Sequence, residues 1–344
     1  MHVEENVVYD FEHHLFCDVY RPPRSIAETP PPVVILVHGG AWMFGNKKRL
    51  VTIATSLCIN NYVVCVVPEY NLSQLDHMVL QNILFFDWLL LIVLCIFARH
   101  KRSILFFILC ISVLLSICVV ICIMRQSETK QNAHPAHVKD IATCIQWVVQ
   151  NANSPILHID TNRLFLLGHS AGAHLCALAT LNPRFLPLST RACIRGVVCI
   201  SGLYSFWQLQ DSFTKFFINR GVFAEHAKDL TKRDFERLPY VKQCDCASCK
   251  SKAKRWEHVI DAWPMFHVAS CNLEPKPRFL ILTSDLDFSI LNHAMEFTKE
   301  LKQHQFYVQH LHFEGTNHFS IRKHWNTKHK HIATAVQDFL AFLS

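Results

Sequence analysis

The chain carries the stretch Leu164-Phe165-Leu166-Leu167-Gly168-His169-Ser170-Ala171-Gly172. Its four leading apolar residues are typical of a buried strand, and the small residues at 173–181 are typical of a helix. Glycines two positions before and after Ser170 allow a sharp turn from strand to helix, which leaves the serine hydroxyl exposed at the end of the strand. The stretch therefore predicts a nucleophilic Ser170, the alternative being a glycine-rich turn with an inert serine.

A second motif follows another apolar run. Residues 33–37 have the branched apolar composition of a parallel strand buried on both faces, and they end in His38-Gly39-Gly40-Ala41-Trp42. Paired glycines at this place leave backbone N–H groups free to converge on one point, as the oxyanion of a tetrahedral intermediate requires. We expect donors at Gly40 and Ala41 and a loop oriented by His38. The predicted oxyanion-hole residues are Gly39, Gly40, Ala41 and Ala171.

An acid and a base are expected downstream of the serine, in that order. Residues 278–283 predict a buried strand that leads to Asp285 and Asp287, and a carboxylate just past such a strand can orient a histidine. Residues 308–313 predict the last strand, and the polar turn after it carries His318. The chain has 22 histidines, so order and strand context, rather than residue type, single out His318.

These motifs resemble those of α/β-hydrolases of the esterase/lipase group with a His-Gly-Gly-x-Trp motif. That group includes hormone-sensitive-lipase-like carboxylesterases, kynurenine formamidases and isoprenylcysteine methylesterases. The similarity covers residues 15–73 and 134–342, and residues 201–221 are similar to the methylesterases. It implies an α/β-hydrolase fold, with a mostly parallel central sheet and helices on both faces.

The resemblance also decides between the two candidate acids. The acid of this family lies four residues after the end of its strand, which implies Asp287 rather than Asp285. The preceding pair, Thr283 and Ser284, departs from the His-Gly that the family usually has. The implied catalytic residues are Ser170, Asp287 and His318.

The resemblance implies a serine hydrolase that cleaves a carboxylic ester through an acyl-enzyme intermediate, with no cofactor and no metal. The implied partner is a small-molecule ester, such as a lipophilic ester or the methyl ester of a prenylated cysteine. Two alternatives remain open. One is hydrolysis of an N-formyl amide, as in the kynurenine formamidases. The other is a catalytically inactive, membrane-anchored hydrolase-like protein that only binds.

The apolar content of the chain is concentrated in one segment. Residues 83–98 and 103–124 carry only one charged side chain, that of Asp87, and the basic residues 99–102 separate them. The second run has the length, about 20 residues, at which a helix crosses a bilayer. The segment 74–133 is therefore predicted as a hydrophobic insert.

The insert divides the predicted catalytic domain into residues 1–73 and 134–344. A single crossing would leave the oxyanion loop and the nucleophile on opposite sides of a membrane. We therefore expect a two-helix membrane hairpin at 74–133. Two other interpretations are a hydrophobic finger that dips into one leaflet and a non-native segment such as a translated intron.

These features predict a membrane-associated protein, attached through residues 79–124 to the endoplasmic reticulum or another internal membrane. Residues 1–10 lack a signal peptide, which favours a cytosolic catalytic domain. The positive-inside rule conflicts with this, because it places the basic residues 99–102 in the cytosol. If the insert is not native, a cytoplasmic protein is expected.

Cysteine and charge carry weaker signals. Three of the 15 cysteines, Cys244, Cys246 and Cys249, lie within residues 222–262, where we expect a cap or lid-like region. A zinc site needs a fourth ligand, so an exposed loop is favoured there. The formal net charge of +7 is spread along the chain, and the two blocks of the basic C-terminal run, residues 322–324 and 328–331, contain no phenylalanine, tyrosine or tryptophan. No nucleic-acid partner is therefore expected.

Overall fold

The computed structural model describes residues 1–23, 29–73, 132–205, 246–287, 290–323, 325 and 330–341. Apart from residues 73 and 132, they belong to one compact unit made of residues 1–72 and 133–344. Residues 74–131 of the predicted insert and residues 222–245 of the predicted cap lie outside the described residues. The hairpin thus stays a prediction.

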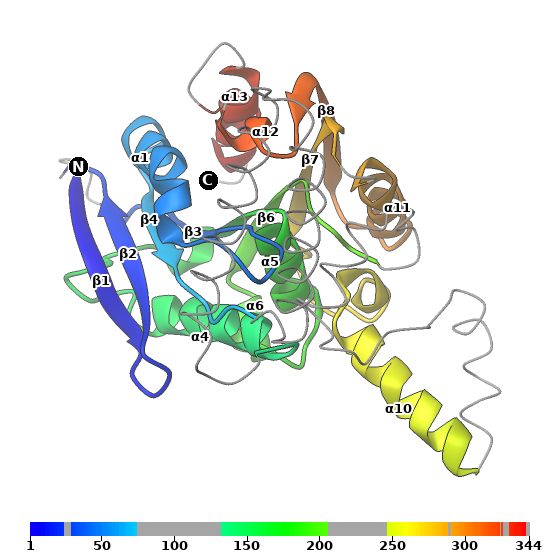
Figure 1. The fold of residues 1–344 in the computed structure, drawn as a ribbon. Coiled ribbons are helices and arrows are strands. Elements are labelled where there is room, and N and C mark those ends of the chain that lie inside the picture. The colour runs from blue at the N-terminus through cyan, green and yellow to red at the C-terminus, as the bar shows by residue number, and fades with distance from the viewer. Residues whose placement is uncertain are drawn as a thin grey trace, which may run out of the picture. The chain divides into compact units, whose positions relative to one another are not determined.

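The described residues form an eight-stranded sheet in the order β1-β2-β4-β3-β5-β6-β7-β8 (Figure 1). The first two strands are antiparallel to their neighbours, and the other six are parallel to one another. The mostly parallel sheet predicted from the sequence is therefore confirmed. Its strands are β1 (His2–Asp10), β2 (Leu15–Arg21), β3 (Val33–Val37), β4 (Val64–Pro68), β5 (Leu164–His169), β6 (Ile194–Ile200), β7 (Arg278–Leu286) and β8 (Val308–Asn317).

Helices pack on both faces of the sheet. One hydrophobic cluster joins the sheet to α4, α5 and α11, and a second joins its other face to α1 and α13. The helices are α1 (Val51–Asn60), α4 (Ala136–Gln150), α5 (Ala171–Leu181), α6 (Leu188–Arg191), α10 (Ala247–Asp261), α11 (Ile290–Gln303), α12 (Ser320–Lys323) and α13 (Lys330–Ala341), with short 3₁₀ helices η1 (Lys47–Leu50), η2 (Thr161–Arg163) and η3 (Pro264–His267).

The central strand β3 shows why the sequence builds this layered structure. Ile35 packs into the cluster with α4 and α5, whereas Val34 and Leu36 pack into the cluster with α1 and α13. All five residues of the strand are fully buried, as expected for a parallel strand covered on both faces. The apolar run predicted as a buried strand is thus confirmed.

Two strands are longer than the sequence predicts. We expected β7 to end at residue 283 and β8 at residue 313, but they continue to Leu286 and Asn317. These two residues pair with each other beyond an irregularity that starts at Ser284. Backbone pairing with a neighbouring strand continues through polar residues. Ending the predicted strands where the apolar residues end therefore placed both ends too early.

The expectation of a membrane-associated protein is wrong on this structure. Among the described residues, no helix is long and apolar enough to cross a membrane. The longest described helices, α4 and α10, have 15 residues each. At 1.5 Å per residue they extend for about 22 Å, short of the roughly 30 Å hydrocarbon layer. Residues 79–124, on which the expectation rested, lie outside the described part of the chain.

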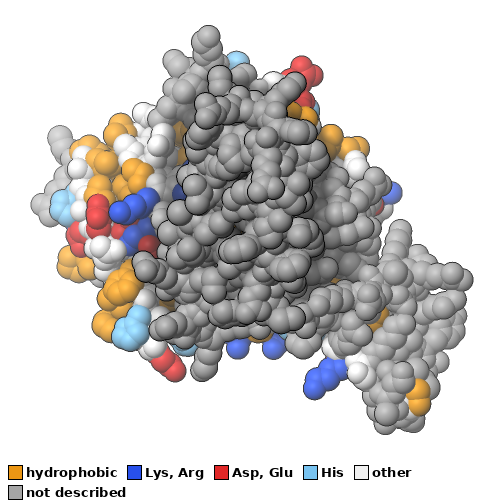
Figure 2. Space-filling model, viewed as in Figure 1, with side chains coloured by type: hydrophobic (Ala, Val, Ile, Leu, Met, Phe, Trp, Pro, Cys, Tyr) orange, Lys and Arg blue, Asp and Glu red, His pale blue; other side chains and the backbone are white. Residues whose placement is uncertain are grey.

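The described surface mixes residue types. Figure 2 shows hydrophobic side chains beside acidic, basic and histidine side chains over β1 and β2. Phe11, in the turn between these strands, is 81% exposed. Single exposed apolar residues of this kind are common on globular domains, so we assign no interface to this face.

Candidate active site

Ser170 occupies a strained turn between β5 and α5. Its φ of 55° and ψ of −120° are unusual for a residue with a side chain, and such strain persists only where the surroundings enforce it. Gly172 permits the turn, because a Cβ there would lie 2.1 Å from the Val37 carbonyl oxygen of β3. The helix begins at Ala171, two residues earlier than the run at 173–181 suggests.

The structure brings Ser170, His318 and Asp287 together. His318 Nε2 lies 3.0 Å from Ser170 Oγ, and His318 Nδ1 lies 2.6 Å from Asp287 Oδ1. All three residues are buried. Because a carboxylate only accepts hydrogen bonds, Nδ1 carries the imidazole proton and Nε2 is free to accept from the serine hydroxyl.

The parallel strands β7 and β8 bring the acid and the histidine together. The last paired residues of these strands are Leu286 of β7 and Asn317 of β8. Asp287 directly follows the first of them, and His318 directly follows the second. The His318 N–H then donates to the Leu286 carbonyl oxygen at 2.9 Å. The two side chains are therefore neighbours because their strands end side by side.

The second candidate acid lies elsewhere. Asp285 is exposed, with its carboxylate 2.8 Å from His312 Nε2 and 2.6 Å from the Gly315 N–H. These hydrogen bonds, from Gly315 first and then His312, lower the pKa of Asp285. The carboxylate that contacts His318 is that of Asp287.

Sequence reasoning missed two residues of this site. Ser201 Oγ donates to Asp287 Oδ2 at 2.7 Å, and its N–H is bound to the Leu282 carbonyl. His169 Nε2 donates to the His318 carbonyl at 2.8 Å. Ser201 follows β6 directly, so a polar residue directly after the apolar run 197–200 was the available signal.

Replacing Ser201 by alanine is expected to lower kcat for ester hydrolysis roughly 3- to 30-fold, because Asp287 loses a charge-assisted hydrogen bond. Steady-state kinetics on purified protein will measure the change, with the thermal unfolding midpoint as a control for folding. A kcat within about twofold of wild type would show that the Ser284 N–H, which donates to the same oxygen at 3.2 Å, suffices.

The oxyanion loop after β3 lies against the serine. A Cβ on Gly39 would lie 2.9 Å from Ser170 Cβ. Gly40 and Ala41 both have positive φ, 141° and 52°, so the loop turns back sharply. Within the described structure, the N–H groups of Gly40, Ala41 and Ala171 donate to no acceptor. The loop that contacts the serine and the first residue of α5 thus carry three backbone N–H groups without an acceptor in the described structure.

His174 links this loop to the end of α10. The indole N–H of Trp42 donates to His174 Nδ1 at 3.3 Å, and His174 Nε2 donates to the Ala262 carbonyl at 2.7 Å. Both side chains are buried. The residue after the predicted donor Ala41 is therefore fixed by the segment that follows α10.

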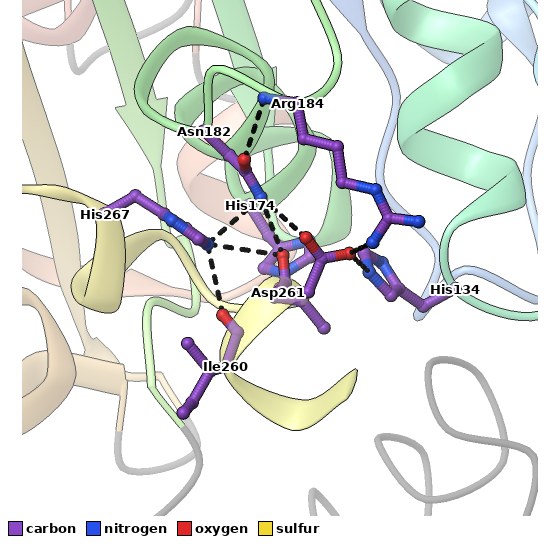
Figure 3. Close-up of polar contacts among 8 residues, drawn as sticks. His134, His174, Asn182, Arg184, Ile260, Asp261 and His267 are labelled. Carbon is purple, nitrogen blue, oxygen red and sulfur yellow. Dashed lines mark hydrogen bonds and ion pairs between the residues drawn. The ribbon is translucent and has the colours of Figure 1, made fainter. Parts of the chain in front are cut away.

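Asp261, at the end of α10, lies at the centre of a polar network (Figure 3). Its carboxylate is 2.6 Å from Arg184 Nη1, 2.9 Å from His134 Nε2 and 3.1 Å from Asn182 Nδ2. Burial alone would raise the pKa of Asp261, but hydrogen bonds from His134, Arg184 and Asn182 hold it well below its usual range. The network anchors α10 to the starts of α4 and of the loop after α5.

Burial keeps several histidines neutral around the site. It lowers the pKa of His38 to about 4 and the pKa values of His137, His169 and His174 to about 3. Their unfolded pKa is about 6.5, so the unfolded chain binds more protons at acid pH. The stability these neutral histidines contribute is complete above about pH 6.5 and is lost as the pH falls toward their folded pKa values.

We therefore expect the free energy of unfolding to fall steeply between about pH 6.5 and pH 4.5, by up to about 1.4 kcal/mol per pH unit for each such histidine. Urea unfolding over this range will measure it. Asp140, whose pKa burial raises to about 6, acts in the opposite direction. His137→Gln should reduce the slope and the exposed control His331→Gln should not. Equal slopes in both variants would contradict the assignment.

The described residues include no group of three or more His, Cys, Asp or Glu side chains that could hold a metal ion. Of the predicted cysteine cluster, Cys246 is exposed, Cys244 lies outside the described residues, and only the backbone of Cys249 is described. The cluster is therefore not tested as a ligand set.

The sheet, the strained turn at Ser170 and the loop after β3 define a protein of the α/β-hydrolase fold. The BD-FAE family model matches residues 17–81 and 111–221, and the chain belongs to this family. The resemblance to esterase/lipase-type α/β-hydrolases predicted from the sequence is thus confirmed.

A carboxylic ester hydrolase is similar to this chain in sequence. The chain is 24% identical over 303 residues to the probable carboxylic ester hydrolase LipM of Mycobacterium tuberculosis, a match that covers 86% of this chain. It spans only 50% of the length of that relative.

Solved esterases have a similar fold. One from Pyrobaculum calidifontis superposes with a TM-score of 0.61 at 15% identity, over 99% of this chain and 84% of its own. The propionate-bound Est2 of Thermogutta terrifontis superposes with a TM-score of 0.59 at 14% identity, over 99% of this chain and 94% of its own. A fungal esterase from Rhizomucor miehei superposes with a TM-score of 0.58 at 18% identity, over 99% of this chain and 82% of its own. At these identities the likeness shows the fold alone.

Proposed function

We propose that this chain is a serine esterase that cleaves a carboxylic ester through an acyl-enzyme intermediate. The observation that carries the proposal is the contact series from Ser170 Oγ through His318 to Asp287, at 3.0 and 2.6 Å. A hydroxyl, a neutral imidazole and a buried carboxylate in this order are the parts that nucleophilic acyl transfer needs.

In the first half-reaction, Ser170 Oγ attacks the ester carbonyl carbon while His318 Nε2 takes the hydroxyl proton. The carbonyl oxygen becomes an oxyanion, which accepts hydrogen bonds from the N–H groups of Gly40, Ala41 and Ala171. As the bond to the alcohol breaks, His318 returns its proton to the leaving oxygen. The product is an acyl ester on Ser170.

In the second half-reaction, water attacks the acyl-enzyme and His318 again acts as the base. The tetrahedral intermediate collapses to release the acid and to restore the serine hydroxyl. Asp287 holds the tautomer of His318 and stabilises the imidazolium, and Ser201 holds the second oxygen of Asp287.

The comparisons support this chemistry. LipM is named a probable carboxylic ester hydrolase, and the three solved structures described above are named esterases, one of them bound to propionate. For this chain, we propose a lipophilic ester, as the resemblance implies, as the substrate.

A substrate panel tests the proposal. We expect hydrolysis of p-nitrophenyl acetate and of a long-chain p-nitrophenyl ester, with the kcat/KM ratio between them reporting acyl preference. N-formylkynurenine should be cleaved far more slowly. Faster cleavage of the formamide would favour the amide-hydrolase alternative. No turnover of any substrate by the folded wild type would favour a protein that only binds.

A further inference from the structure

The carbonyl oxygen of Gly39, in the predicted oxyanion loop, accepts hydrogen bonds from two side chains. His38 Nδ1 lies 3.1 Å from the Gly39 oxygen, and the Arg49 guanidinium nitrogen Nη1 lies 3.4 Å from it. The His38 ring stacks on Tyr70 at 4.4 Å, and the Tyr70 hydroxyl donates to the His38 carbonyl at 3.0 Å. The carbonyls of two consecutive loop residues are thus both held by side chains.

The contacts at the Gly39 carbonyl also determine the direction of the Gly40 N–H. A trans peptide is planar, so the Gly39 C=O and the Gly40 N–H point in opposite directions. Fixing the carbonyl toward Arg49 therefore fixes the Gly40 N–H away from Arg49. That N–H donates to no acceptor in the described structure, although the Gly40 carbonyl accepts from Phe44 N–H at 2.8 Å.

Arg49 has no carboxylate partner in the described part of the chain. Neither Arg49 nor Arg322 forms an ion pair with a carboxylate of the described chain, and Arg322 Nη1 donates to the Arg49 carbonyl. Burial, with a smaller contribution from the positive charge of Arg49, lowers the pKa of His38 to about 4, although the hydrogen bond to the Gly39 carbonyl acts in the opposite direction. The guanidinium is therefore the charged group at this carbonyl, with its field partly screened by solvent because Arg49 is exposed, while the imidazole stays uncharged.

A cation at a carbonyl oxygen polarises the whole peptide, which strengthens the N–H of the same peptide as a hydrogen-bond donor. The orienting effect and the polarising effect both act on the Gly40 N–H, one of the three predicted oxyanion donors. Neither effect requires Arg49 to touch the substrate. Arg49 is also exposed, so removing its side chain should leave the fold intact.

We propose that Arg49 is a positioning residue of the oxyanion hole, whose guanidinium holds and polarises the Gly39–Gly40 peptide so that the Gly40 N–H stabilises the tetrahedral intermediate. The inference rests on the proposed esterase function and adds to it a residue outside the loop. Since the oxyanion exists only after attack, the effect belongs to kcat rather than to ground-state binding.

The test compares Arg49→Gln with Lys48→Gln, which removes the same charge from the exposed neighbouring residue. Removal of a whole oxyanion donor costs roughly 10²–10³ in kcat, so weakening one should cost about 10- to 100-fold. We expect that loss of kcat for Arg49→Gln on p-nitrophenyl acetate, with KM within about threefold of wild type. Lys48→Gln should retain wild-type kinetics, and all unfolding midpoints should agree.

Chemical rescue provides a second readout. Added ethylguanidinium should restore part of the lost kcat in Arg49→Ala and should not raise the activity of Lys48→Ala. A kcat near wild type in Arg49→Gln, an effect on KM alone, or an equal loss in the Lys48 variant would overturn the proposal. An inactive wild-type chain would instead overturn the esterase function, so the two failures are distinguishable.

Discussion

The Ser170→Ala variant is expected to hydrolyse esters with a kcat roughly 10⁴- to 10⁶-fold below that of wild type, because no other group at this position can form the acyl-enzyme. The oxyanion donors and His318 remain, so a small residual rate above the uncatalysed reaction is expected. Initial rates on p-nitrophenyl acetate at saturating concentration will measure the loss.

A matched control for this variant is Ser189→Ala, which removes an exposed hydroxyl from α6. It should keep wild-type kinetics. Ser170→Ala removes only a hydroxyl group, so both variants should unfold near the wild-type midpoint. Ser170→Ala with more than about a tenth of wild-type activity would exclude the acyl-enzyme route at this residue.

The second large effect is expected for Asp287→Asn, with a loss in kcat of about 10⁴-fold. An amide can donate to His318 Nδ1, which would place the imidazole proton on Nε2 and block that atom as a base. Side-by-side kinetics at neutral pH will measure the loss.

Asp285→Asn is the natural control, since it makes the same chemical change two residues away. Its carboxylate contacts His312 and Gly315 rather than His318. We expect at most a few-fold change in kcat. If Asp285→Asn lost more activity than Asp287→Asn, the acid assigned here would be the wrong one.

The turn at Ser170 and the loop after β3 were predictable because their chemistry is local. Small residues around one serine and paired glycines after a buried strand determine backbone shape within a few positions. The buried strand at 33–37 was equally predictable, since an uninterrupted branched apolar run satisfies both faces of a parallel sheet.

Other features of the site depend on tertiary contacts. The ends of β7 and β8 depend on pairing between Leu286 and Asn317, which polarity alone does not reveal. The hydrogen bond from Ser201 to Asp287 joins residues 86 positions apart, and the contact of Arg49 with Gly39 depends on how a loop folds back. The first two contacts follow from the sheet order, and the third follows from the path of the loop after β3.

The central claim is that Ser170 is a nucleophile activated by His318. The most direct test treats the folded wild-type chain with a fluorophosphonate and locates the adduct by peptide mass spectrometry. We expect one adduct, on Ser170, and none on the Ser170→Ala variant. A folded wild type that stays unlabelled, or carries its adduct on another residue, would contradict it.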